Sequence, residues 1–188
     1  MKQLSQASKT AIGGMTVALS VVLLIPTALD IFVYALPAIA GFLTLFCVIE
    51  IGKRWAFGVY FATSLLSLLL VPNKEAAVMY TAFFGYYAIV KALLENSRLP
   101  RAVEYLLKFL IFNASVVLAY LVLIYAFGMP LDDVLGIDGN VWWSKYALPV
   151  MLVLGNAVFL AFDFALTRMA MVYLKVLQPK LHKLFRFK

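Results

Sequence analysis

Long apolar runs alternate with short polar connections along the whole chain. A helix needs roughly 20 apolar residues to cross a hydrocarbon core about 30 Å thick. Six stretches have this character, at residues 10–26, 30–51, 55–71, 75–94, 103–127 and 145–174. Pro37 and Gly41 lie in the second stretch, where we expect a kink or a division of the helix. The pattern predicts an all-α integral membrane protein with six transmembrane helices.

The composition excludes a water-soluble domain and most catalytic chemistry. Hydrophobic residues occupy 65% of the 188 positions and charged residues 13%, whereas soluble domains are about half apolar and a quarter charged. The chain has one cysteine, Cys47, and one histidine, His182, too few for a catalytic triad or a histidine metal site. It also lacks a Walker A loop and a Gly-x-Ser-x-Gly elbow. We therefore expect no enzymatic activity, no cofactor and no metal site.

Positive charges predict the orientation of the spans. If the N-terminus is cytoplasmic, all of the 16 lysines and arginines except Lys74 and Lys145 fall on the inner side. The outer connections carry acidic residues such as Asp30 and Glu75. Because positively charged short loops stay in the cytoplasm, we expect both termini to be cytoplasmic in a multi-pass protein of the inner (plasma) membrane.

The C-terminal segment differs in character from the spans. Residues 175–188 alternate cations with apolar side chains, which is typical of a helix lying on anionic lipid. The sequence therefore predicts a six-helix transmembrane domain, 1–174, and a basic amphipathic cytoplasmic tail, 175–188. The expected partner of this tail is membrane lipid and not nucleic acid.

Polar side chains inside membrane spans are costly and mark candidate sites. Asn113 in the fifth stretch and Asn156 in the sixth both fall near mid-depth at 1.5 Å per helical residue, so they can face each other. Two interpretations stay open: a hydrogen bond between helices, or the floor of a small-molecule pocket with aromatic walls. The predicted ligand contacts are Asn113, Asn156, Tyr80, Tyr86 and Trp142.

Asp163 is a carboxylate placed deep in the last span. It lies seven residues after Asn156, on the same face of the helix, and Lys91 in the fourth stretch has a similar depth. A buried carboxylate without a partner is destabilising or takes up a proton. We expect a structural salt bridge between Asp163 and Lys91, with Arg168 as the alternative partner. A proton relay is the functional alternative.

Small residues repeat at four-residue spacing in two of the stretches. Gly14 and Ala18 lie in the first, and Gly58 and Ala62 lie in the third. Such pairs let another helix approach closely, from within the chain or from a partner protein. Both interpretations stay open from the sequence.

These features together resemble the substrate-binding (S) components of energy-coupling factor (ECF) transporters. The resemblance is carried by six spans in a chain of this length, by KTAIGGMTVALS at 9–20, and by Gly14-xxx-Ala18 and Gly58-xxx-Ala62 in place of the family's usual AxxxA. It implies that helices one and three contact a transmembrane T subunit driven by two cytoplasmic ATPase subunits. It also implies that a vitamin, a vitamin precursor or a metal ion binds near the outer side and that the S component topples to release it. No signature of the riboflavin, thiamine, biotin or cobalt members is present.

The expected function is therefore a membrane-embedded small-molecule binding subunit of an ECF-type uptake transporter, with a vitamin-like substrate. The alternative is a structural or scaffold protein of the cell envelope without a ligand, similar in topology to the six-span rod-shape membrane proteins. A cavity around Asn113 and Asn156 distinguishes the two, because a scaffold protein would leave its interior filled.

Overall fold

The computed structural model describes residues 4–30, 32–130 and 144–178, and all of the regular secondary structure in these ranges is helical. Trp142 and the tail from residue 179 onward lie outside the described residues. The elements are α1 (Gln6–Leu24), η1 (Ile25–Leu29), α2 (Ala35–Glu50), α3 (Lys53–Leu70), α4 (Lys74–Met79), η2 (Tyr80–Phe84), α5 (Gly85–Glu95), α6 (Arg101–Tyr125), α8 (Ser144–Val172) and η3 (Tyr173–Leu177). The predicted all-α fold is confirmed.

Within the part of the chain that the structure describes, four helical segments are long and apolar enough to cross a membrane: Gln6–Leu29, Lys74–Glu95, Arg101–Tyr125 and Leu152–Val176. α2 is apolar but shorter, and α3 begins with the cations Lys53 and Arg54. Large apolar side chains project from the surface, among them Leu69 on α3 and Val153 on α8, which are 69% and 70% exposed. Lipid solvates such a surface, whereas water does not. The chain is therefore an all-helical membrane protein.

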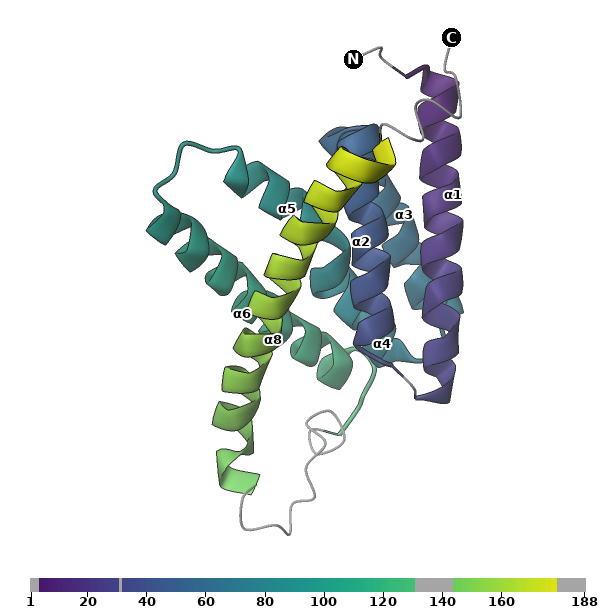
Figure 1. Cartoon of the computed structure of the whole chain (residues 1–188). Coiled ribbons are helices and arrows are strands. Elements are labelled where there is room, and N and C mark those ends of the chain that lie inside the picture. Colours follow the sequence, from purple (N-terminus) through teal and green to yellow (C-terminus); the bar gives the residue numbers. More distant parts are fainter. Residues whose placement is uncertain (1–3, 31, 131–143, 179–188) are drawn as a thin grey trace.

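Successive helices run between two ends of the molecule (Figure 1). The start of α1, the α2–α3 and α5–α6 connections and the end of η3 lie at the upper end, which we call the basic end. Its cations include Lys9, Lys53, Arg54, Arg98, Arg101 and Lys175. The α1–α2 and α3–α4 connections lie at the opposite end, where Asn73 Nδ2 donates to Asp30 Oδ1 at 2.9 Å. This bond joins the two connections.

α2 packs against α1, α3, α5, η2 and α8, and therefore lies at the centre of the bundle. It begins later than predicted, at Ala35, and continues without interruption to Glu50. The predicted kink or division is wrong, because Pro37 lies in the first turn, where the helix needs no backbone N–H donor. Gly41 instead permits a close contact between helices. A Cβ at this position would lie 2.6 Å from the carbonyl oxygen of Phe84.

α4, η2 and α5 follow one another directly and form one helix with a π-helical middle. In this middle segment the N–H of Gly85 donates to the carbonyl of Tyr80, five residues earlier. Tyr60 on α3 donates from Oη to the carbonyl of Thr81 at 2.8 Å, which attaches α3 to the π segment. Position 85 requires glycine, because a Cβ would lie 2.8 Å from the rings of Tyr60 and Tyr80.

The contact between α2 and η2 is tested by Gly41→Ala. The added methyl group meets the backbone of Phe84, so we expect the free energy of unfolding to fall by about 1–3 kcal/mol. Gly58→Ala is the matched control, because nothing lies within 4 Å of a Cβ there and alanine favours the helix. Thermal unfolding in detergent measures both variants. An equal Tm for the two would contradict the contact.

Candidate functional site

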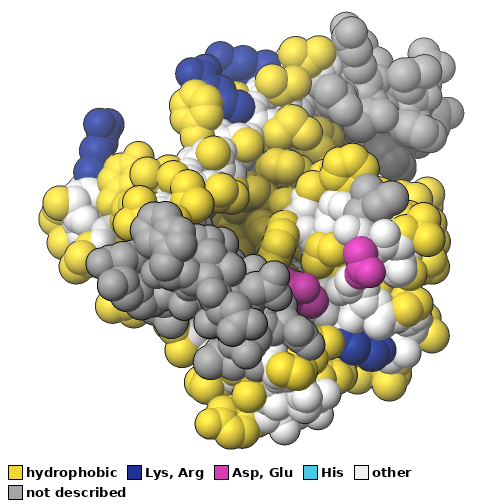
Figure 2. Space-filling model, turned by 90° about the horizontal axis from the view of Figure 1, so that it is seen from below, with side chains coloured by type: hydrophobic (Ala, Val, Ile, Leu, Met, Phe, Trp, Pro, Cys, Tyr) yellow, Lys and Arg dark blue, Asp and Glu magenta, His cyan; other side chains and the backbone are white. Residues whose placement is uncertain are grey.

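An apolar cavity of about 520 Å³ lies between η2, α6 and α8. Its wall includes Phe83, Phe84, Phe112, Asn113 and Tyr120, and we call it the aromatic cavity. No lysine, arginine, histidine or carboxylate is among the described residues that line it. Figure 2, which views the molecule from the end opposite the basic end, shows a hollow with hydrophobic walls. Both its volume and its lining are typical of small-molecule sites.

Asn113 connects this cavity to a polar pair between α6 and α8. Its Nδ2 donates to Oδ1 of Asn156 at 3.0 Å, and Nδ2 of Asn156 donates back to Oδ1 of Asn113 at 3.2 Å. Each Nδ2 also donates to a carbonyl of its own helix, that of Phe109 or Leu152, at 2.8 Å. All four amide hydrogens therefore have acceptors on α6 and α8. Asn113 joins the helices and also lines the cavity, whereas Asn156 serves the pair alone.

Tyr80 and Tyr86, which were predicted to contact the same ligand, do not line the aromatic cavity. Tyr80 is completely buried, and its Oη lies 3.4 Å from Oγ1 of Thr44 on α2. Tyr86 Oη lies 2.5 Å from Oγ of Ser115 on α6. The structure therefore does not place these tyrosines in the cavity that Asn113 borders, and their contact with a ligand stays a prediction. Met79, Phe83 and Phe84 line the cavity instead, while Tyr80 is directed toward α2 and Tyr86 contacts α6 at Ser115, which is not a wall residue.

The phenylalanines of the cavity wall were not predicted. Phe112 stacks on Phe159, with ring centroids 4.7 Å apart, and Phe83 meets Phe112 edge-on at 5.1 Å. Two sequence signals were available: Phe112 directly precedes Asn113, and Phe83 and Phe84 directly precede Gly85. Such aromatic runs are ordinary in membrane helices, so their position alone did not identify them.

A second candidate site is a pair of buried charges between α5 and α8. Nζ of Lys91 lies 2.6 Å from Oδ1 of Asp163, the partner considered first from the sequence. Tyr87 donates from Oη to the same oxygen at 2.7 Å. Arg168, the alternative partner, lies over the ring of Phe164, 4.7 Å from its centroid. The carboxylate is thus held by one ammonium group and one hydroxyl group in the protein interior.

Lys108 on α6 extends this pair into a larger network, which was not predicted. Its side chain is 2% exposed, and its Nζ lies 2.7 Å from Glu104, 3.0 Å from Glu95 and 3.6 Å from Asp163. Lys91 also pairs with Glu95, at 2.5 Å. We call these five charged residues the charge network. It has one more carboxylate than ammonium groups and connects α5, α6 and α8, as expected of a structural clamp.

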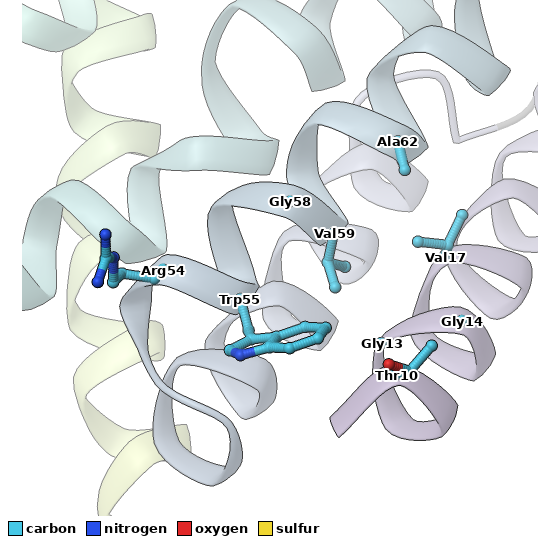
Figure 3. A pocket seen from close by; sticks show the side chains of 9 residues that line it. All are labelled: Thr10, Gly13, Gly14, Val17, Arg54, Trp55, Gly58, Val59 and Ala62. Atoms are coloured by element: carbon cyan, nitrogen blue, oxygen red, sulfur yellow. The ribbon is translucent and has the colours of Figure 1, made fainter. Parts of the chain in front are cut away.

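A third candidate site is a groove of about 510 Å³ between α1 and α3 (Figure 3). We call it the small-residue groove, and its lining includes Thr10, Gly13, Gly14, Trp55, Gly58 and Ala62. Three of the four predicted partner-contact residues therefore lie together. The fourth, Ala18, is exposed on α1 but does not line the groove.

Neighbouring glycines in this groove have different roles. A Cβ at Gly13 would lie 3.2 Å from Cγ2 of Val59, so Gly13 allows α1 to pack closely on α3. A Cβ at Gly14 or Gly58 would have nothing within 4 Å. Packing among the described residues thus accounts for Gly13, but it gives no reason for the small residues at positions 14 and 58. These two positions leave the groove open toward the surroundings.

The charge network predicts a graded effect on stability. Lys108→Met leaves the three carboxylates of the network with one ammonium group, that of Lys91, so we expect a loss of about 3–5 kcal/mol in the free energy of unfolding. Adding Glu95→Gln to this variant removes one of the carboxylates and should restore part of the loss. Arg168→Met, at an exposed position, is the control and should change Tm little. If Lys108→Met unfolds at the same temperature as Arg168→Met, the network is not a clamp.

Comparisons with protein-family models, curated proteins and solved structures find no match for this chain. The function is therefore argued from the three sites themselves. The aromatic cavity provides a place for a small molecule, the charge network holds the helices beside it, and the small-residue groove provides an accessible surface on the helices α1 and α3.

Proposed function

We propose that this chain is the substrate-binding subunit of an ECF-type uptake transporter, which captures a small molecule in the aromatic cavity and docks on a T subunit through the small-residue groove. Two partner ATPases energise the uptake, and the chain itself catalyses no reaction. The observation that carries the proposal is the open groove, because no contact among the described residues requires Gly14 and Gly58 to be small.

The cavity favours transport over the scaffold function. A scaffold protein gains nothing from empty space in its interior, since each void forfeits packing contacts. The aromatic cavity borders Asn113, one of the two positions around which the scaffold hypothesis requires filled space. Its wall lies on η2, α6 and α8, whereas the groove lies on α1 and α3, so both can be occupied at the same time.

In the proposed topology, the chain crosses the membrane six times and both termini are cytoplasmic. α2 and α3 supply the two crossings beyond the four long apolar segments. The distribution of charge supports this orientation, because cations gather at the basic end and cytoplasmic loops are enriched in lysine and arginine. The aromatic cavity then opens toward the outer half of the bilayer, where a ligand enters during uptake.

Cysteine labelling in intact cells tests the orientation. The native Cys47 is buried, so the unmodified chain should give little background. Pro72→Cys in the α3–α4 connection and Ser97→Cys in the α5–α6 connection both introduce exposed thiols. We expect a membrane-impermeant maleimide to label the first variant in intact cells and the second only after permeabilisation. The reverse pattern would overturn the proposed topology.

The docking surface is tested by filling the groove. The double variant Gly14→Leu plus Gly58→Leu places two large side chains in open space, so the chain should fold while docking is lost. Ala11→Leu plus Ala161→Leu adds the same bulk at exposed positions outside the groove and is the matched control. The measurement is mild extraction from native cells, followed by mass spectrometry of the proteins that co-purify.

A T subunit and paired ATPases should accompany the wild-type chain and the control, and should be absent from the groove variant. Recovery of these subunits with the groove variant in wild-type amounts would rule out the groove as their docking surface. Recovery of cell-wall synthesis proteins alone with the wild-type chain would replace transport by the scaffold function.

A further inference from the structure

We propose that the aromatic cavity selects an uncharged, predominantly aromatic molecule that carries one or two hydrogen-bonding groups. The inference rests on the proposed function for its biological meaning, since it names the class of substrate, but its physical basis is the cavity alone. Charge, polar groups and wall shape each restrict the ligand.

The charge of the ligand is restricted because the described wall has no charged side chain. The lining residues include no cation and no carboxylate. The carboxylate of Glu75, which accepts a hydrogen bond from the hydroxyl of the wall residue Tyr34, does not itself line the cavity. Transfer of an unpaired ionic group from water into such surroundings is strongly unfavourable. A carboxylate, phosphate or ammonium group on the ligand would therefore have no counter-charge in the cavity wall.

The wall nevertheless offers a small number of polar atoms. The amide hydrogens of Asn113 are all used, yet its Oδ1 accepts one bond from Asn156 and keeps a second lone pair. The hydroxyl of Tyr120 has no hydrogen-bond partner among the described residues. Tyr34 Oη donates to Glu75 and keeps its acceptor capacity. These groups suit a ligand with one N–H or O–H donor and a second polar atom.

The remaining wall suits a flat ring. Phe83 and Phe112 form an edge-on pair, and Phe112 is stacked on Phe159 at 15° between planes, so these rings hold one another in place. Aromatic pairs gain additional stability in stacked or edge-on geometry. On the α6 and α8 side, Val117 and Val158 are 53% and 65% exposed, so this wall borders lipid. An uncharged ring can enter from the bilayer, whereas an ion cannot.

A pair of fluorescent probes tests this inference. N-phenylnaphthylamine is uncharged, aromatic and has one N–H donor, whereas anilinonaphthalenesulfonate has the same ring system with an added sulfonate. Each probe is titrated into the purified full chain in phosphatidylcholine nanodiscs, with empty nanodiscs as the blank. Val116→Phe adds bulk to the cavity wall, and Val153→Phe adds the same bulk at a lipid-exposed position that does not line the cavity.

We expect the uncharged probe to bind the wild-type chain and Val153→Phe saturably, and to bind Val116→Phe at least about tenfold more weakly. The sulfonate probe should show no component that depends on position 116. If the sulfonate binds as tightly as the uncharged probe with the same dependence, the selection against charge is wrong. If the uncharged probe gives equal signals with both variants, it does not bind in the cavity and the inference is wrong. If native mass spectrometry finds a phospholipid retained by the wild-type chain and lost from Val116→Phe, the cavity is a lipid site.

The probe experiment uses the chain without partners, which separates its failure from failure of the proposed function. Loss of probe binding with normal recovery of the T subunit and ATPases would overturn the substrate class and leave transport in place. Normal probe binding without these subunits would overturn the ECF assignment and leave the cavity as a binding site for uncharged aromatic molecules.

Discussion

The position of α6 depends on polar contacts that it makes with the neighbouring helices. Only 22% of the residues in the apolar stretch of α6 are buried, against 56% in the Lys74–Glu95 helix, so apolar packing holds α6 weakly. Three residues along α6 form polar contacts instead: Lys108 with the charge network, Asn113 with Asn156, and Ser115 with Tyr86. Because the bilayer supplies no water to replace them, these contacts cannot be exchanged for solvent. They place Phe112 and Tyr120 on the wall of the aromatic cavity.

α2 separates the two surfaces that the proposed transport cycle uses, the small-residue groove and the aromatic cavity. α2 lies between the α1–α3 pair and the η2–α6–α8 group and contacts both. Its contact with η2 depends on Gly41, and the contact of α3 with the π segment depends on Tyr60. A partner bound in the small-residue groove would therefore touch helices whose packing continues, through α2 and η2, to the wall of the cavity.

The sequence was sufficient to predict the helices and the depth of their polar residues, which follow from the lipid surroundings. It was insufficient to predict which way individual side chains point, which depends on packing between helices. Apolar runs predicted the helices because hydrocarbon excludes unpaired backbone groups. Depth along a helix brought together Asn113 with Asn156 and Lys91 with Asp163, since a rise of 1.5 Å per residue measures depth directly. Lys108 was placed with the inner-surface cations, because nothing in the sequence shows that its ammonium group turns inward. The groove lining likewise depends on which glycine, Gly13 or Gly14, faces the neighbouring helix.

The π segment explains why the cavity wall could not be found by helical periodicity. In an α-helix, residues five apart point about 140° away from each other, so Met79 and Phe84 would lie on different faces. Here the hydrogen bond from Gly85 to Tyr80 spans five residues, and the wider turn brings positions five apart toward one face. Met79, Phe83 and Phe84 consequently line one cavity, and Tyr80 is directed into the packing against α2. The widened turn has no residue signature of its own, because it is stabilised by contacts from α2 and α3 that only the folded chain provides.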